Sequence, residues 1–520
     1  MTSPNTVQEI ESKWTLASPS DADPLRRRIE AAGATISKPR NIEILDHYLD
    51  TRDGFFRLAR ARCRLRCCDG VFELNLKGTG EPSDGVFSRP ERTYSLEGIA
   101  TESEALDQIH GHELGAVLRG RKLELLFGIR NRRTQFDVTL ADGTTAELCF
   151  DDAHAFADGR AAKIHEAELE FREGDLGAFR KLVADIGRAP VGSSERSKFR
   201  AAVEALELTD SLPEYPEYAY ALDDTIGRAG REAVARNLRI IELNEPGVRV
   251  GFHEEAIHDM RVAARRTRAA LAAFRKVLPR DSRRLAGEAK WLGQALGKGR
   301  DLEVQIESLF GFAAKLPLDQ RRTLVRYRRI LEKRLAVESE GIVDVLNSPQ
   351  YPALVEGLQR LVSSPPRKKK EARVVREAGP KILAKATSRI LDRYAREIDP
   401  RIHDEHLHKL RLDLKRVRYV FELFSHVGAP EVGQFVKATK KMQDILGTHQ
   451  DVCTGIEMLR HDVSALRARA RKEDEAGLID ALADLTDLLV EEKEKLRQRF
   501  FRSWPDYRVR RDMEQAAAAL

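Results

Sequence analysis

Polar and apolar positions alternate over short stretches in the N-terminal third of the chain, a pattern that predicts strands with two different faces. In the opening run Val7-Gln8-Glu9-Ile10-Glu11-Ser12-Lys13, the side chains of Glu9, Glu11 and Lys13 share one face. Two carboxylates and one ammonium are costly to bury without partners, and a divalent cation with an anionic ligand would supply them. A solvated edge strand is the simpler interpretation of this motif taken alone, so the later strands decide between the two.

Charged faces recur along the following strands. The sets that share a face are Arg62, Arg64 and Arg66; Glu73, Asn75 and Lys77; Arg89 and Glu91; Glu147 and Asp151; and Glu166, Glu168 and Glu170. If these strands close into a barrel, the charged side can line its lumen. Acidic strands would then hold a metal ion, and basic strands would hold phosphate oxygens.

The second half of the chain has helical periodicity and repeats itself after 150 positions. The offset continues without a gap to Leu296-Gly297 and Asp301, which match Leu446-Gly447 and Asp451. Each copy carries a basic stripe on one helical face: His258, Arg261, Arg265 and Arg268 in the first copy, and His408, Arg411, Lys415 and Arg418 in the second. The repeat therefore indicates duplication of a helical unit.

A basic stripe of this kind is unfavourable by itself. Like charges three or four residues apart cost about 0.2–0.5 kcal/mol per pair, and the stripe contains no acidic residue to offset them. A bound polyanion would remove this cost. A solvated basic face is the alternative explanation, and the presence of the stripe in both copies favours the polyanion.

Composition supports a plan of two parts. The chain has 520 residues, 42% of them hydrophobic, which is enough to fill two or more cores. Lys and Arg number 30 against 34 Asp and Glu up to residue 205, and 59 against 49 beyond it, so the helical half is the basic one. We expect a first domain at 1–205, a linker at 206–222 and a helical domain at 223–512, with repeat copies at about 223–362 and 373–512.

Hydropathy and cysteine usage bear on the location of the protein. No apolar run is long enough to span a bilayer, and the N-terminus lacks a signal-peptide core. The five cysteines are odd in number and offer no two pairs at metal-ligand spacing, so we expect reduced thiols and no zinc site. The expected location is the cytoplasm, without a membrane partner.

The N-terminal motifs resemble the CYTH domain of the triphosphate tunnel metalloenzymes. The matching pieces are E-x-E-x-K at Glu9, Glu11 and Lys13, Arg64-Leu65-Arg66, Lys77-Gly78, Arg89-Pro90-Glu91, Glu147 with Asp151, the strand of Glu166, Glu168 and Glu170, and Ser197-Lys198. Cys63 departs from the apolar residue usual at its position. The resemblance implies an eight-stranded antiparallel β tunnel barrel.

The same resemblance implies roles for individual residues. Glu9, Glu11, Glu168 and Glu170 would bind Mg²⁺ or Mn²⁺. Lys13, Arg64, Arg66, Lys77, Arg89, Arg133 and Lys198 would bind the triphosphate, although Arg130 and Arg132 crowd Arg133 and leave the register of that strand open. Glu9, Glu11 and Lys13 would act in catalysis, and Glu147 and Asp151 are the candidates for the base that deprotonates water.

The helical half, from about residue 223 to 510, resembles the CHAD domain. The resemblance rests on both H-x-x-R-x-x-x-[RK]-R-x-R helices and both L-G-x-x-x-D turns. It implies an all-α module of two four-helix bundles related by a pseudo-twofold axis. It also implies that inorganic polyphosphate binds the histidines and basic residues of both stripes, and that the protein associates with polyphosphate granules.

Together the two halves predict an α+β multidomain protein that resembles the CYTH-CHAD inorganic triphosphatases. Its expected reaction is metal-dependent hydrolysis of inorganic triphosphate to pyrophosphate and phosphate. Nucleoside or thiamine triphosphatase activity remains open, as does an adenylate cyclase, although no motif supplies an adenine pocket. A non-enzymatic binder of polyphosphate or nucleic acid is the other alternative. The 6% aromatic content and the lack of an aromatic-rich basic motif argue against nucleic acid as a partner.

Overall fold

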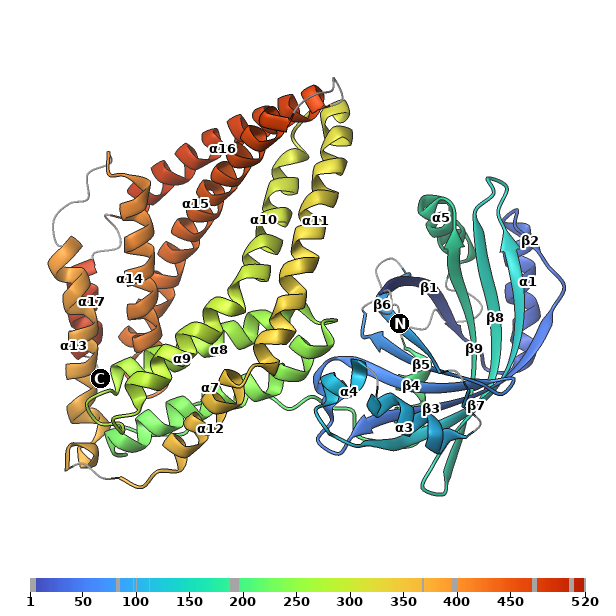
Figure 1. The fold of residues 1–520 in the computed structure, drawn as a ribbon, viewed down its shortest axis with the longest axis horizontal. Coiled ribbons are helices and arrows are strands. Elements are labelled where there is room, and N and C mark those ends of the chain that lie inside the picture. The colour runs from blue at the N-terminus through green and yellow to red at the C-terminus, as the bar shows by residue number, and fades with distance from the viewer. Residues whose placement is uncertain are drawn as a thin grey trace. The chain divides into compact units, whose positions relative to one another are not determined.

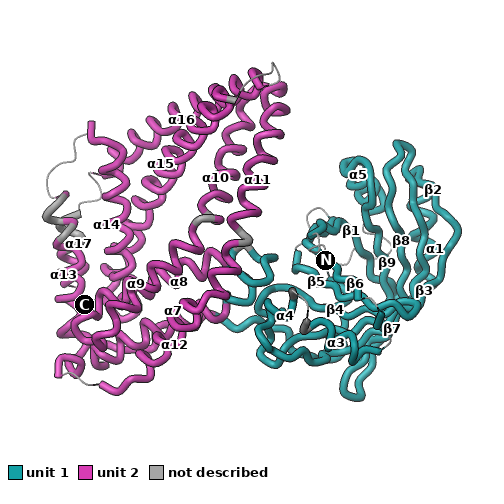
Figure 2. The backbone as a smooth tube through the Cα atoms, in the orientation of Figure 1, with its two compact units in different colours: residues 1–214, 244–256 teal, residues 215–243, 257–520 magenta. Residues whose placement is uncertain are grey.

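The chain forms two compact units (Figure 2). One comprises residues 1–214 and 244–256, and the other residues 215–243 and 257–520. The computed structural model describes residues 6–80, 85–96, 98–99, 101–111, 113–187, 196–366, 369–394, 401–469, 475–504 and 509–518. The domain boundaries expected from the sequence, 1–205, 206–222 and 223–512, remain a prediction.

The first unit is built on a closed antiparallel sheet (Figure 1). Its strands are β1 Val7–Thr15, β2 Thr35–Ile36, β3 Arg40–Thr51, β4 Ala61–Cys68, β5 Val71–Gly78, β6 Phe87–Leu96, β7 Leu123–Thr139, β8 Thr145–Ala157 and β9 Arg160–Glu173. They follow the order β7-β3-β4-β5-β6-β1-β9-β8, and β7 pairs with β8 to close the ring. The short strand β2 pairs with β7 as well. The predicted eight-stranded antiparallel barrel is therefore confirmed.

Helices of the first unit cover the outer face of the barrel, except α6 (Lys198–Ala205), whose Lys198 and Phe199 line the cavity inside it. The others are η1 Pro19–Asp21, α1 Ala22–Ala31, α2 Phe55–Leu58, α3 Glu102–Gly111, α4 Glu113–Leu118 and α5 Leu176–Ile186. Apolar residues of the strands point outward into these helices: Leu148 and Leu169 pack with Phe179 of α5, whereas Leu65 and Leu74 belong to a second core. Because side chains alternate, the charged positions of the same strands are left facing the lumen.

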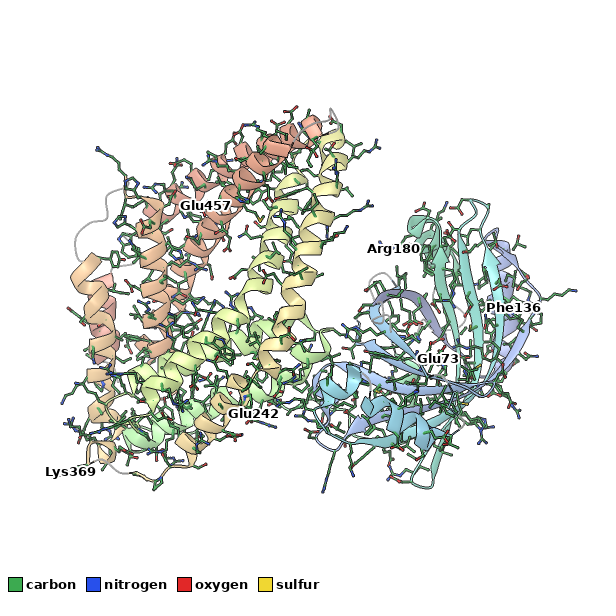
Figure 3. All side chains as sticks on the ribbon, in the orientation of Figure 1. Glu73, Phe136, Arg180, Glu242, Lys369 and Glu457 are labelled. Atoms are coloured by element: carbon green, nitrogen blue, oxygen red, sulfur yellow. The ribbon has the colours of Figure 1, made fainter. Side chains whose placement is uncertain are left out.

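The second core of the barrel unit also takes residues from far along the chain. Val250 is fully buried there beside Leu65 and Leu74, and the guanidinium of Arg92 lies 4.7 Å from the ring centre of Phe252. The tunnel core thus includes a segment well beyond residue 205. Figure 3 shows all described side chains and marks Glu73, which lines the lumen.

The described residues between 226 and 518 form helices joined by short connections, as expected. The helices are α7 Ile226–Val250, α8 Glu254–Ala273, α9 Ser282–Ala295, α10 Gly297–Ala313, α11 Leu318–Asn347, α12 Gln350–Ser363, η2 Lys369–Ala372, α13 Val375–Tyr394, α14 Asp404–Glu422, α15 Pro430–Arg469, α16 Ala476–Ser503 and α17 Val509–Ala518. None of the helices in the described ranges is long and apolar enough to cross a membrane.

The duplication is visible in the helices themselves. An offset of 150 residues places α7 on α13, α8 on α14, α11 on α16 and α12 near α17. The long helix α15 corresponds to α9 and α10 together, which meet at Leu296. One hydrophobic core joins α10 and α11 of the first copy with α15 and α16 of the second, so this four-helix bundle takes two helices from each copy.

Candidate active site

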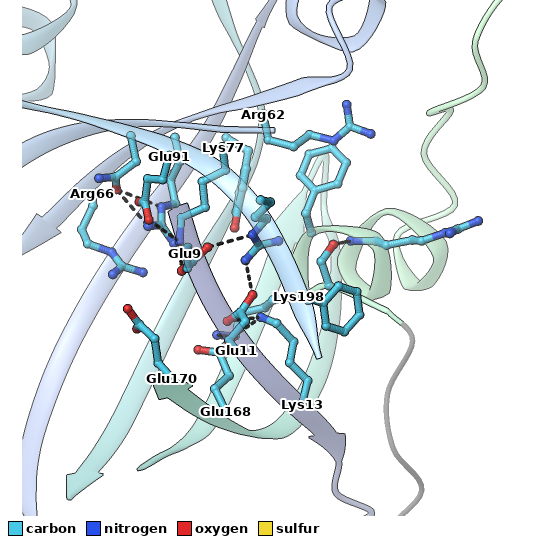
Figure 4. Close-up of a pocket in the computed structure, with 18 of the residues that line it drawn as sticks. Glu9, Glu11, Lys13, Arg62, Arg66, Lys77, Glu91, Glu168, Glu170 and Lys198 are labelled. Carbon is cyan, nitrogen blue, oxygen red and sulfur yellow. Dashed lines mark hydrogen bonds and ion pairs between the residues drawn. The ribbon is translucent and has the colours of Figure 1, made fainter. Parts of the chain in front are cut away.

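The barrel encloses a cavity of about 840 Å³ whose wall is predominantly charged (Figure 4). Of the residues expected in the tunnel site, those lining it are Glu9, Glu11, Lys13, Arg64, Arg66, Lys77, Arg89, Arg133, Glu147, Glu168, Glu170 and Lys198. Asp151 lies behind this wall and bonds to two of its cations. The structure therefore brings together residues from seven of the strands and from α6.

Glu9 and Glu11 are held by cations on the neighbouring strands. The register of β1 with β6 sets Glu9 opposite Arg89, whose guanidinium lies 2.8 Å from Glu9 and 2.5 Å from Glu11. Lys77 of β5 is 2.7 Å from Glu9. Burial by itself raises the pKa of Glu9, but Lys77, Arg89 and Lys13 lower that pKa far below its usual range. Glu9 is consequently ionised and available as an oxygen ligand.

A second network surrounds Glu168. This carboxylate pairs with Lys13 and lies 2.6 Å from Arg133. Arg133 also donates two hydrogen bonds of 2.8 Å to Asp151, which settles it as the arginine of β7 that faces this network. Lys198 lies 2.6 Å from Asp151 and 3.8 Å from Glu168. Burial raises the pKa of Glu168, but the cations Lys13, Lys198 and Arg133 lower it well below its usual range.

Sequence reasoning missed Asp46, which orients two of the expected phosphate-binding arginines. Its buried carboxylate accepts hydrogen bonds of 2.8 and 2.9 Å from Arg66 and lies 3.5 Å from Arg64. Arg64 is held further by Asn75, at 2.9 Å. The signal that could have found Asp46 is a polar position alternating with apolar neighbours on β3, but polar His47 lies on the other face and apolar Ile44 and Tyr48 share the face of Asp46.

The carboxylates offer two groupings for a divalent cation. Asp151, Glu166 and Glu168 present oxygens within 4.8 Å of one another, but Lys198 and Arg133 already bind them. The second grouping is the expected set of Glu9, Glu11, Glu168 and Glu170. Within it, Glu170 lies directly opposite Glu11 in the register of β1 with β9.

Glu170 is repelled by the other carboxylates of the lumen, although Arg172 lies 2.7 Å from it. Burial and the charges of Glu9 and Glu11 raise the pKa of Glu170 to about 7, against the opposing charges of Arg172 and Lys77. Removing that repulsion calls for a cation, and Mg²⁺ and Mn²⁺ prefer oxygen ligands of this kind. Of the expected metal ligands, Glu9, Glu11 and Glu170 come from the paired strands β1 and β9, whereas Glu168 is already paired with Lys13 and Arg133.

In the helical unit, the two basic stripes meet. Burial and the charges of Arg265, Arg411, Arg261 and Arg418 together lower the pKa of Lys415 to about 7, so these residues lie close together across α8 and α14. Among the described residues, no carboxylate lies within 4.0 Å of the charged groups of Arg265, Arg411 or Lys415.

The remaining stripe residues have different surroundings. Asp301 of α10 lies 2.8 Å from Arg261, and Glu422 lies 3.0 Å from Arg418, so acids do reach the stripe. The sequence showed Asp301 as part of the repeated L-G-x-x-x-D turn, but not as a partner of Arg261, because it comes from another helix. His408 bonds to Gln450 at 2.8 Å, His258 is exposed, and Arg268 is exposed with Arg416 near it.

Each repeated L-G turn lies against a stripe arginine of its own copy. A Cβ atom on Gly297 would lie 3.2 Å from the guanidinium of Arg261, a tight contact, whereas one on Gly447 would lie 3.8 Å from Arg411, an ordinary van der Waals contact. Steric crowding therefore favours glycine at position 297 only.

A third group of metal-ligand types lies at Asp404, His449 and Cys453. Lys493 at 3.0 Å and Arg497 at 2.9 Å occupy the carboxylate of Asp404, so its negative charge is already balanced. All five cysteines are unpaired.

Comparison with protein families identifies both halves. A CYTH domain model matches residues 7–200, and a CHAD domain model matches residues 232–460. The chain carries a CYTH domain followed by a CHAD domain. The expected resemblance is thereby confirmed for both parts.

One curated relative is the inorganic triphosphatase of Haemophilus influenzae, which is 29% identical to the CYTH-CHAD chain over 170 residues. The match covers 33% of this chain and 47% of the relative, so it spans about half of that protein's length.

Solved structures resemble each half separately. The CHAD domain from Ricinus communis is 22% identical and covers 59% of this chain and 96% of its own, with a TM-score of 0.41. The Hippeastrum protein HpAC1, reported to have a dominant triphosphatase activity, is 21% identical and covers 38% of this chain and 95% of its own, with a TM-score of 0.29.

Proposed function

We propose that the CYTH tunnel hydrolyses inorganic triphosphate to pyrophosphate and phosphate in a metal-dependent reaction. The observation that supports this most is the wall of the cavity, where Lys13, Arg64, Arg66, Lys77, Arg89, Arg133 and Lys198 converge from different strands. Charges arranged around an enclosed space suit a compact polyanion, and the Haemophilus influenzae inorganic triphosphatase matches part of the chain.

The seven basic residues named above form a cage around the lumen. Their ion pairs suggest how this cage receives its substrate. Lys77 and Arg89 are both bound to Glu9. Glu9, Glu11, Glu168 and Glu170 would hold Mg²⁺ or Mn²⁺, and Lys77 and Arg89 would then bind phosphate oxygens in place of their carboxylate partners. The bound ion would supply charge neutralisation at the phosphoryl group being transferred.

Chain residues account for the remaining roles. Arg64 and Arg66, oriented by Asp46, hold phosphate oxygens and stabilise the charge that develops on the departing pyrophosphate. A water molecule attacks the terminal phosphorus in line. Glu147 lines the cavity and so is the better placed base, whereas Asp151 lies behind the wall; both carboxylates have cationic partners, Arg172 for Glu147 and Arg133 with Lys198 for Asp151.

A phosphate-release assay tests this proposal. Purified protein is supplied with inorganic triphosphate, ATP or thiamine triphosphate in the presence of Mg²⁺ or Mn²⁺, and cyclic AMP is measured alongside phosphate. We expect the largest kcat/KM for inorganic triphosphate. Cyclic AMP formation from ATP would establish the cyclase alternative instead, and a preference for thiamine triphosphate or ATP would reassign the substrate.

We further propose that the CHAD domain binds inorganic polyphosphate at the joined stripes. Arg265, Arg411 and Lys415 support this, since their charges are close together and the described residues give them no carboxylate partner. A chain of phosphates would relieve this repulsion. Binding of labelled polyphosphate to the full chain tests the proposal, with single-stranded RNA as competitor. Location in the cytoplasm beside polyphosphate granules is part of the same proposal.

A further inference from the structure

Arg62 extends the row of arginines on β4 toward one end of the lumen. It shares a face with Arg64 and Arg66, and all three line the cavity. The register of β4 with β5 sets it directly opposite Lys77. Two residues along a strand advance about 6.6 Å, so Arg62 lies one such step beyond Arg64.

The contacts of Arg62 differ from those of the other lumen cations. Its guanidinium lies 4.3 Å from the ring centre of Phe199 on α6 and donates a hydrogen bond of 2.6 Å to Asp210. Phe199 follows Lys198, one of the proposed triphosphate ligands. Arg62 is thus stacked in place beside the triphosphate cage.

Asp210 is placed so that a phosphoryl group could replace it as the partner of Arg62. It lies in the irregular segment that follows α6, whereas Glu9, Asp46 and Glu168 belong to the barrel strands. Its side chain retains 25% exposure, against 1% for Asp46. Burial lowers the pKa of Arg62, and the charges of Asp210 and Asp50 only partly offset this, so the buried positive charge is not fully compensated.

We propose that Arg62, released from Asp210 and stacked on Phe199, forms an outer phosphate subsite, so that the tunnel also hydrolyses linear inorganic polyphosphates longer than triphosphate. This inference rests on the proposed triphosphatase function. The inner cage holds the reacting end, and the additional phosphoryl groups extend past Lys77 to Arg62. The forked guanidinium can bind two oxygens of one phosphoryl group.

The chemistry is the same hydrolysis on a longer chain. Each turnover consumes one water, whose oxygen bonds to the terminal phosphorus. The P–O anhydride bond breaks, its electron pair stays on the bridging oxygen of the shortened chain, and the proton of the water passes to solvent. The products are phosphate and a polyphosphate one unit shorter.

The test compares kcat/KM for tripolyphosphate with kcat/KM for longer polyphosphates in the full chain. Arg62→Met keeps an unbranched apolar stem over Phe199 but removes the charge, so the ratio of long-chain to triphosphate kcat/KM should fall about tenfold or more. Asp210→Asn should raise the ratio, because the competing carboxylate is gone. Arg62→Lys keeps the charge without the fork and should give an intermediate ratio.

A matched control is Arg132→Met. Arg132 pairs with Glu43 at 3.6 Å on the outer surface of the barrel, where the two side chains are 78% and 79% exposed. This variant should leave the ratio at the wild-type value. Thermal melting of each variant establishes that the barrel is folded.

The possible outcomes distinguish failure of the outer subsite from failure of the proposed triphosphatase function. Wild-type protein that hydrolyses tripolyphosphate but no longer chain would overturn the outer subsite and leave the proposed function standing. Equal losses on both substrates in Arg62→Met would show a purely structural role and would also overturn the subsite. Inactivity on every phosphate chain would contradict the proposed triphosphatase function itself.

Discussion

Asp46 of β3 and Arg66 of β4 face each other across paired strands and are joined by two hydrogen bonds, of 2.8 and 2.9 Å. The carboxylate is buried, and burial by itself would raise its pKa. The charges of Arg64 and Arg66 outweigh burial and lower the pKa of Asp46 below its usual range. Asp46 is therefore a fixed negative charge that orients both arginines toward the lumen.

Asp46→Asn tests this orientation. The substitution preserves shape but leaves buried guanidinium groups without their countercharge, which costs about 3–5 kcal/mol for a fully buried pair and less here because Arg66 is partly exposed. We expect KM for triphosphate to rise about tenfold or more. Asp137→Asn is the control, because Asp137 pairs with Arg40 at 2.8 Å on the surface. Equal effects of the two variants on KM would contradict the role of Asp46.

The carboxylates of β1 give a second prediction. Glu9→Gln and Glu11→Gln keep the size of the side chain but remove a negative metal ligand, so kcat should fall about a hundredfold, as is typical when stabilisation of transition-state charge is lost. Turnover is measured at saturating metal. Wild-type kcat under that condition would exclude these residues from metal binding. Glu43→Gln on the outer face serves as the control.

Metal removal gives a third prediction. Glu170 is buried near Glu9 and Glu11, so a bound divalent ion should relieve their repulsion and stabilise the barrel. We expect EDTA to abolish hydrolysis and added Mg²⁺ or Mn²⁺ to restore it and raise Tm. The Tm increase should shrink in Glu170→Gln. Full activity after exhaustive chelation would contradict metal dependence.

How far the sequence predicts this molecule depends on whether an interaction is local. Alternation along one strand places Arg64, Arg66 and Lys77 on the lumen side, because side-chain direction follows from strand geometry alone. Asp46 was missed because its neighbour His47 is also polar, so the alternation is weak, and because its partners lie on another strand.

Long-range packing was equally invisible in the sequence. Asp301 comes to Arg261 from another helix, and Val250 completes a core built by β4 and β5. No periodic pattern encodes either contact, because each depends on how separate elements pack. The basic stripes, by contrast, repeat at a fixed offset within single helices and were found without a structure.

A fourth prediction concerns the CHAD domain. Changing Arg261, Arg265, Arg411 and Lys415 together to Glu should abolish polyphosphate binding by the full chain, because the joined stripes would become acidic. The control changes four exposed basic residues of α11 to Glu: Arg322, Arg326, Arg329 and Lys333. The control carries the same change in net charge and should retain binding. Binding is measured by a shift of labelled polyphosphate at several salt concentrations, with circular dichroism to monitor folding.

Retained binding by the stripe variant would show that the stripes are only a solvated face. Loss of binding in both variants would point to net charge rather than to a site. Hydrolysis in the tunnel should be unaffected by the α11 control, which lies outside both proposed sites.

The last prediction is a pH dependence carried by Lys415. Its pKa of about 7 reflects burial and the charges of Arg265, Arg411, Arg261 and Arg418, so Lys415 gains its proton as the pH falls from 8 to 6. A polyanion binds the protonated form better, and polyphosphate affinity should therefore rise over this interval. Without ligand, the depressed pKa means that protonation of Lys415 opposes folding, so polyphosphate should raise Tm more at pH 6 than at pH 8. Lys415→Arg, which stays charged, should bind with a flatter pH profile, and Lys415→Met should bind more weakly at pH 6. An unchanged pH profile in both variants would assign the dependence to other groups, among them His258 and His408.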